Sequence, residues 1–185
     1  DVFVELQKGY IEAGSDVLYA PTFTCSRIKL AEYGLEERQR ELIFDLVGLT
    51  KRAIRESQTE RKIYIAGDMT MTGEQLEPIG SLPFEELIDV YKQQAGYLHE
   101  AGVDLFAVET MRSLQECRGA LIAIRETCGE EVPVLVTLTF QDDGRTLYGT
   151  KPETAAIVLE AMGADVIGIN CSAGPDKMFD LVSRM

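Results

Sequence analysis

The sequence repeats one pattern three times: a stretch with helical spacing, then Gly-x-Asp, then a short apolar run. The apolar runs are Val17–Ala20, Leu105–Val108 and Val166–Ile169. Glycine suits the left-handed position that follows a helix, because it has no Cβ to clash at positive φ. An apolar run of this length after such a turn is typical of a buried strand. The three units therefore predict an α/β protein in which helices and strands alternate.

Two further apolar runs, Lys62–Ala66 and Val132–Phe140, predict strands between the repeats. We therefore expect five strands, each followed by a helix, with one more helix, Asp1–Ala13, in front. The other expected helices cover Leu35–Ser57, Phe84–Ala101, Leu114–Thr127, Thr154–Met162 and Asp176–Arg184. Continuous β-branched runs are typical of parallel strands that are buried on both faces. Such strands fit an open doubly wound sheet or part of an eight-stranded barrel, and a chain with a helix at each end favours the barrel.

Charge and cysteine usage exclude several classes of protein. A net charge of −13 disfavours nucleic acid and anionic membrane surfaces as partners. We find no apolar run of the roughly 18 residues that a membrane span needs, and no signal peptide at the start. The four cysteines are widely spaced and form no C-x-x-C pair, which predicts a reducing, cytoplasmic location with free or metal-bound thiols.

Polar side chains follow the predicted strands at the point where each strand ends. They are Thr22, Asp68, Glu109, Thr139 and the pair Asn170–Cys171. Because the carboxyl ends of parallel strands share one edge of the sheet, we expect these side chains to lie on one face. A carboxylate for an ammonium group and an amide for a carboxylate would allow this face to bind a small zwitterion.

Each candidate also has a plainer interpretation. Glu109 is either a functional acid or a solvated loop residue, and a buried acid is costly unless it is used. Asp68 is equally suited to capping a turn, and Asn170 to forming one. Cys171 fits a metal ligand, a nucleophile or a structural thiol. Cys25 is a candidate for a supporting role on the same face.

The other sulfur and imidazole groups are expected outside the site. Cys117 lies on a predicted helix and Cys128 near the end of that helix, and both are predicted to be structural. The single histidine, His99, precedes a helix end, which disfavours Ser–His and Cys–His hydrolase schemes. No Gly-x-Gly-x-x-Gly or Walker-type loop indicates nucleotide binding. Thiolate or thiolate–metal chemistry is what remains.

Three segments, Tyr10–Leu30, Gly102–Ala123 and Thr137–Pro175, resemble the homocysteine S-methyltransferase domain family. Members form the homocysteine-binding barrel of cobalamin-dependent methionine synthase and of betaine–homocysteine methyltransferase. The most specific motifs are Val108-Glu109-Thr110, Leu138-Thr139-Phe140 and Gly168-Ile169-Asn170-Cys171-Ser172. The resemblance implies a (β/α)8 TIM barrel, of which residues 1–185 would be one partial domain covering the second to sixth strands, with the first and last strands missing.

The resemblance also implies a site and a reaction. One zinc ion would be held by three cysteines, with Cys171 as the first and two more in a Gly-Gly-Cys-Cys run that this sequence does not contain. Coordination of the homocysteine thiol to zinc would remove its proton, and the thiolate would attack a methyl group to give methionine. Glu109 would hold the substrate ammonium, and Asn170 and Thr22 would shape the pocket. Asp68 is a further candidate for substrate binding.

Two departures from the family pattern leave the methyl donor open. The segment Gly67–Gly73 replaces the usual Gly-Ser-Ile-Gly-Pro-Thr-Gly, and Pro21 replaces the asparagine that usually precedes Thr-Phe. S-methylmethionine, S-adenosylmethionine, betaine and methylcobalamin, the last on another domain or protein, all fit. The alternatives to a zinc methyltransferase are a metal-free α/β binding module and another barrel enzyme that uses Glu109 or Asp68 as a base.

Overall fold

The computed structural model describes residues 1–172 and 174–185. Five strands form one sheet: β1 (Val17–Tyr19), β2 (Tyr64–Met69), β3 (Leu105–Met111), β4 (Val134–Leu138) and β5 (Val166–Ile169). Every neighbouring pair is parallel, and the order in the sheet is the order in the sequence. A doubly wound sheet would reverse its order at a switch point. The consecutive order is that of a (β/α)8 barrel, which confirms the predicted fold class.

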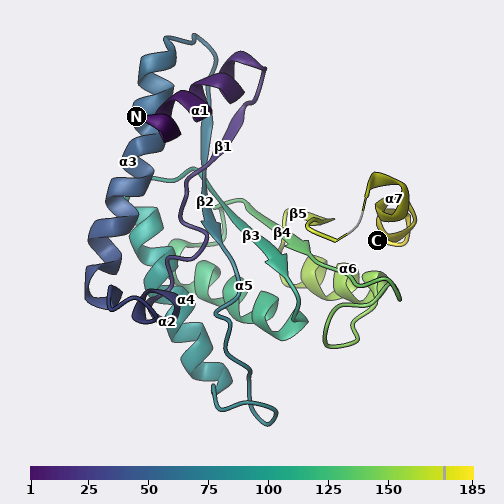
Figure 1. Ribbon diagram of the computed structural model, residues 1–185. Coiled ribbons are helices and arrows are strands. Elements are labelled where there is room, and N and C mark those ends of the chain that lie inside the picture. Colours follow the sequence, from purple (N-terminus) through teal and green to yellow (C-terminus); the bar gives the residue numbers. More distant parts are fainter. Residues whose placement is uncertain (173) are drawn as a thin grey trace.

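The helices follow one another around this sheet (Figure 1). They are α1 (Val2–Glu12), α2 (Arg27–Ala31), α3 (Gln39–Ser57), α4 (Phe84–Glu100), α5 (Leu114–Cys128), α6 (Pro152–Ala161) and α7 (Pro175–Ser183), with a 3₁₀ turn, Glu36–Arg38, before α3. Helices α1, α3, α4, α5 and α6 pack against each other in that order. None of the described helices is long and apolar enough to cross a membrane.

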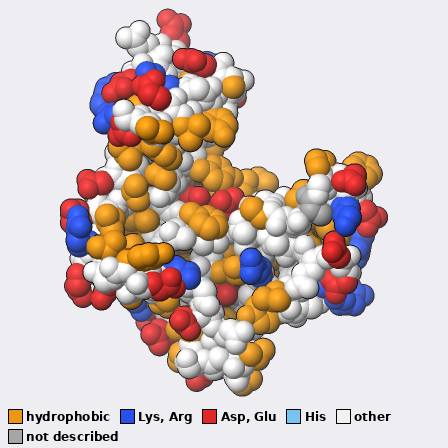
Figure 2. Space-filling model, in the orientation of Figure 1, with side chains coloured by type: hydrophobic (Ala, Val, Ile, Leu, Met, Phe, Trp, Pro, Cys, Tyr) orange, Lys and Arg blue, Asp and Glu red, His pale blue; other side chains and the backbone are white. Residues whose placement is uncertain are grey.

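One face of the sheet is covered and the other is open. Along β4, Val134, Val136 and Leu138 are completely buried, whereas Leu135 and Thr137 between them are only partly buried. On the opposite face from the helices, four side chains keep between 37% and 51% of their surface exposed: Val17, Tyr19, Tyr64 and Val166. The expectation of burial on both faces is confirmed for Ile65–Met69 of β2 and Phe106–Val108 of β3. It is wrong for the outer strands β1 and β5, because five strands do not close a barrel. Figure 2 shows the resulting hollow between the part of the molecule that carries α1 and the part that carries α7.

Both the glycine and the aspartate of the Gly-x-Asp repeat have a structural role. Gly102 and Gly163 have φ angles of 81° and 83°, as predicted for the residue after a helix. The Asp104 carboxylate accepts a hydrogen bond from Ile65 N at 2.8 Å, and Asp165 accepts one from Val134 N at 2.7 Å. Asp104 thus fixes the start of β2, and Asp165 fixes the start of β4.

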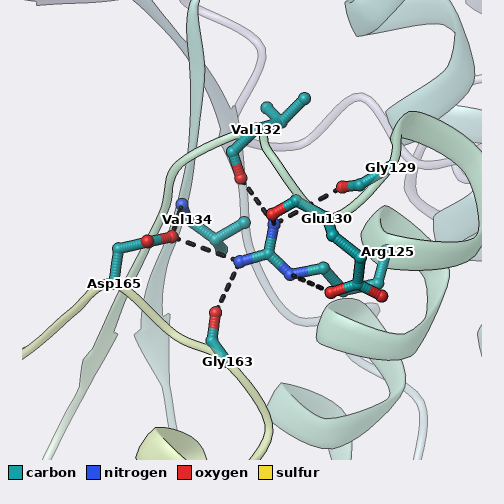
Figure 3. A network of polar contacts seen from close by, with 7 residues as sticks. All are labelled: Arg125, Gly129, Glu130, Val132, Val134, Gly163 and Asp165. Atoms are coloured by element: carbon teal, nitrogen blue, oxygen red, sulfur yellow. Dashed lines mark hydrogen bonds and ion pairs between the residues drawn. The ribbon is translucent and has the colours of Figure 1, made fainter.

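Arg125 of α5 ties the same end of the sheet together (Figure 3). Its guanidinium donates to the carbonyls of Val132 at 2.6 Å and Glu130 at 3.0 Å, and also to that of Gly163. It forms an ion pair with Asp165 at 3.2 Å. This network lies at the amino ends of β4 and β5, away from the carboxyl ends where the polar candidates are found.

Candidate functional site

The carboxyl ends of β2 and β3 extend further than the sequence indicates. The predicted second strand ends at Ala66, but β2 runs to Met69 because Asp68 and Met69 pair with Ala107 and Val108 of β3. Gly and Asp are poor strand formers, and pairing with a central strand overrides that preference. Asp68 therefore lies within the strand and not in the following loop.

The register places Asp68 and Glu109 on the same, open face of the sheet. A Cβ added to Gly67 would meet Leu98 and Val103 at 3.2–3.3 Å, so that position faces the helices. Asp68 is the next residue and faces the other way. It pairs with Ala107, and Glu109 follows two residues later on that same face.

A β-bulge ends β3. The register with β4 shifts between Val108 and Met111, and Thr110 adopts a φ of 60°. A β-branched residue is strained at positive φ, and such strain persists only where surrounding contacts hold it. Here the contact is the side chain of Asn170, whose Oδ1 accepts a hydrogen bond from Thr110 N at 3.0 Å. Bulges of this kind re-aim side chains next to functional sites.

Asn170 is the centre of the site. Its Nδ2 donates to Glu109 Oε2 at 3.0 Å and to Thr110 Oγ1 at 2.9 Å. Its backbone carbonyl accepts a hydrogen bond from Thr139 Oγ1 at 3.1 Å. The amide therefore has a fixed orientation, and it links the ends of β3, β4 and β5.

Cys171 lies directly beyond this amide. It has a φ of 49°, its side chain is exposed, and its Sγ accepts a hydrogen bond from Thr110 Oγ1 at 3.6 Å. In residues 1–172 and 174–185, no group of three or more His, Cys, Asp or Glu side chains is placed to hold a metal ion. The described residues thus offer one accessible thiol at the strand ends and not a complete ligand set.

The other three thiols are buried or half-buried. Burial raises the pKa of Cys25 and of Cys128 to about 11, and it also raises the pKa of the fully buried Cys117. These thiols stay protonated near neutral pH and are poor ligands and nucleophiles. Their burial agrees with the structural role predicted for Cys117 and Cys128.

Thr22 and Asp68 form a buried pair. The Thr22 hydroxyl donates to Asp68 O at 2.9 Å and accepts from Asp68 N at 3.1 Å, so it holds the strand backbone. The Asp68 side chain is 6% exposed, and its Oδ1 has no hydrogen-bond partner among the described residues. Burial, with the nearby charge of Glu109, raises the pKa of Asp68 to about 8.

The two carboxyl groups make the open face acidic. Burial raises the pKa of Glu109, and the Asn170 hydrogen bond opposes that shift. Burial raises the pKa of Tyr19, and the charges of Glu109 and Asp68 raise it further. A cationic group bound here would stabilise the ionised form of both carboxyl groups.

Sequence reasoning gave no role to Thr110 or Tyr19. Thr110 stands next to Glu109 in the Val108-Glu109-Thr110 motif, but its left-handed backbone depends on a partner 60 residues away. Tyr19 could have been found from strand alternation, because it lies two residues beyond Val17 on the open face.

Comparison with known proteins decides the family. The family described as Homocysteine S-methyltransferase matches residues 1–185. The chain belongs to the homocysteine S-methyltransferase family. The methionine synthases of Mycobacterium tuberculosis (strain ATCC 25618 / H37Rv) and Mycobacterium leprae (strain TN) are each 30% identical to it over 182 residues. The match covers 96% of this chain, and the chain spans only 15% of the length of either relative.

Solved structures agree with a homocysteine S-methyltransferase fold. The homocysteine methyltransferase MmuM from Escherichia coli in its oxidized form gives a TM-score of 0.77 at 20% identity, over 91% of this chain and 61% of that one. Its metallated form gives a TM-score of 0.76 at 19% identity, over 91% and 62%. At this identity the likeness concerns the fold, which is that of a section of the barrel.

Proposed function

We propose that this chain is the homocysteine-binding section of a methyltransferase that methylates the homocysteine thiol to give methionine. The observation that carries the proposal is the contact between Asn170 and Glu109, with Cys171 adjacent in the sequence. Membership of the homocysteine S-methyltransferase family and the named activity of the mycobacterial relatives support it.

Different residues of the site bind different groups of the substrate. Glu109, oriented by Asn170, binds the ammonium group through a charge-assisted hydrogen bond. Asp68 provides a second carboxyl group on the same face, and Thr22 positions it through the backbone. Asn170 contacts Glu109 and directly precedes Cys171 in the sequence. A short aliphatic chain can therefore connect an ammonium group bound at Glu109 to a thiol placed beside Cys171.

We also propose that Cys171 is one ligand of a zinc ion. The exposed thiol at the strand end fits that role, and the remaining ligands would come from residues outside those described. Zinc, when bound, lowers the pKa of a coordinated thiol. The methionine synthase relatives are far longer than this chain, which supports a separate domain for the methyl donor, such as methylcobalamin. The free thiols of the described cysteines support a cytoplasmic location for the protein.

The test uses the full-length protein, with zinc content and methionine formation measured on the same preparations. Cys171→Ala should lose zinc and methyl transfer together, whereas Glu109→Gln should keep zinc and raise the KM for homocysteine. The exposed Glu131→Gln serves as a control. A wild-type protein without zinc, together with full methyl transfer by Cys171→Ala, would overturn the proposal. Homocysteine binding without zinc or turnover would indicate a metal-free binding module instead.

A second candidate function follows from Asp68. A buried carboxyl group with a pKa of about 8 and an unpartnered Oδ1 suits a general acid or base in another barrel enzyme. Turnover of a substrate without a thiol, abolished by Asp68→Asn and unchanged in Cys171→Ala, would favour this candidate over methyl transfer.

A further inference from the structure

A separate cavity of about 350 Å³ lies beside the amino end of α5. Its walls come from the loop between β2 and α4, the first turn of α5, and the loop between β4 and α6. None of Glu109, Asn170 and Cys171 lines it. Its size falls at the lower end of the range found for small-molecule sites, roughly 300–1,000 Å³.

Glu116 lines this cavity with a carboxylate of which one oxygen is already held. The residue is 4% exposed, and its Oε2 accepts hydrogen bonds from Thr72 N at 3.1 Å, Tyr91 Oη at 3.2 Å and Thr72 Oγ1 at 3.4 Å. Within residues 1–172 and 174–185, Oε1 takes part in no hydrogen bond. Because all three donors reach Oε2, Oε1 is the oxygen that remains available to a donor in the cavity.

The charge of the lining selects a cation. The cavity is lined by two carboxylates, Glu116 and Glu77, and by no Lys, Arg or His among the described residues. The amino end of α5 would by itself attract an anion, but Glu116 stands in its first turn and already supplies that negative charge. An anionic ligand would therefore meet two like charges.

The remaining walls favour a hydrocarbon body. Leu76, Ile79 and Leu114 contribute aliphatic surface, and Tyr148 contributes an aromatic ring that can also face a cation. We propose that this cavity binds a small aliphatic primary ammonium ion, which donates a hydrogen bond to Glu116 Oε1 and packs its hydrocarbon chain against these apolar walls. The site is independent of the proposed homocysteine site.

A purely structural role for Glu116 makes a different prediction. In that case the carboxylate only joins the loop at Thr72 to Tyr91 of α4. Glu116→Gln keeps a carbonyl oxygen for these donors but turns an NH₂ group towards the cavity. The variant should therefore fold, and it should reject an ammonium ion.

The test is isothermal titration calorimetry on the full-length protein with isopentylammonium, and with isopentanol as its neutral counterpart. We expect saturable binding of the amine. The affinity for the alcohol should be lower by about tenfold or more, because a charged hydrogen bond is lost. Glu116→Gln should weaken amine binding by about tenfold or more. The exposed Glu131→Gln is the matched control and should bind as the wild type does.

Three results would overturn the proposal: no saturable amine binding to the wild type, equal binding of the alcohol, or unchanged amine binding in Glu116→Gln. If Glu116→Gln does not fold, Tyr148→Ala takes its place, since Tyr148 is 42% exposed in a loop. Unchanged amine binding in that variant would contradict the proposal that Tyr148 forms part of the binding site. Cys171→Ala should abolish methyl transfer and leave amine binding intact, so the two proposals fail separately.

Discussion

The side-chain amide of Asn170 donates a hydrogen bond to Glu109 Oε2 across 3.0 Å and thereby joins the end of β5 to the bulged end of β3. The same amide nitrogen donates to Thr110 Oγ1, and the amide oxygen accepts from Thr110 N. Asn170 thus acts on the carboxylate and on the strained backbone beside it. In the proposed function it is a positioning residue for Glu109.

Replacing Asn170 by aspartate tests this relationship. The change removes the donor to Glu109 and adds a negative charge beside it, so the pKa of Glu109 should rise further. We expect the KM for homocysteine to increase by roughly tenfold to a hundredfold, as for loss of a charge-assisted hydrogen bond. Steady-state kinetics at several pH values measures the effect. Ser183→Ala, at the exposed end of α7, should leave KM unchanged; an unaltered KM in Asn170→Asp would exclude the positioning role.

The raised pKa of Asp68 predicts a dependence of stability on pH. Asp68 titrates at about 8 in the folded protein and near its ordinary value of 3.8 when unfolded. Between these two values only the unfolded state releases the proton, so stability should fall as the pH rises from about 4 to 8. Asp68→Asn should remove this contribution and raise the free energy of unfolding at pH 8 by several kcal/mol, since each unit of pKa difference corresponds to about 1.4 kcal/mol.

Urea unfolding of wild type and Asp68→Asn at pH 5 and pH 8 checks the prediction. The difference between the two proteins should be larger at pH 8. Asp45→Asn, an exposed change on α3, is the control. A difference that is the same at both pH values would show that Asp68 titrates normally.

Much of the fold could be predicted because its determinants are local. The glycine after a helix and the apolar run that follows are read directly from neighbouring residues and predict three of the strands, and apolar runs alone predict the other two. The role of Asp104 could not be found, because its carboxylate binds Ile65 in another strand. The extension of β2 to Met69 likewise depends on pairing with β3.

The same contrast between local determinants and contacts of distant residues applies to the candidate site. That Asp68 and Glu109 share a face follows from the rule that parallel strands end at one edge, which is general enough to apply to a bare sequence. The contact between Asn170 and Glu109 joins residues 61 apart and depends on the bulge at Thr110. No sequence pattern specifies a bulge whose strained residue is threonine and not glycine.

Thr22 offers a test of how Asp68 is held. Its hydroxyl bonds both N and O of Asp68 in a buried position, and valine has the same shape without the hydroxyl. Thr22→Val should lower the free energy of unfolding by about 1–3 kcal/mol, because two buried backbone groups lose a partner. Thr22→Ser keeps the hydroxyl and should recover much of the loss. Equal stability of Thr22→Val and wild type in urea unfolding would contradict this role.

Arg125 is predicted to stabilise the other end of the sheet. Its side chain is only 10% exposed and satisfies the carbonyls of Val132 and Gly163 while pairing with Asp165. Arg125→Met preserves the aliphatic length but leaves these acceptors without a donor, so the free energy of unfolding should fall by about 2–4 kcal/mol. Arg55→Met, at an exposed position of α3, should change it by less than about 0.5 kcal/mol. Urea unfolding measures both. Because the network lies at the amino ends of the strands, homocysteine binding by folded Arg125→Met should match the wild type, and a raised KM in that variant would show that the two ends of the sheet are coupled.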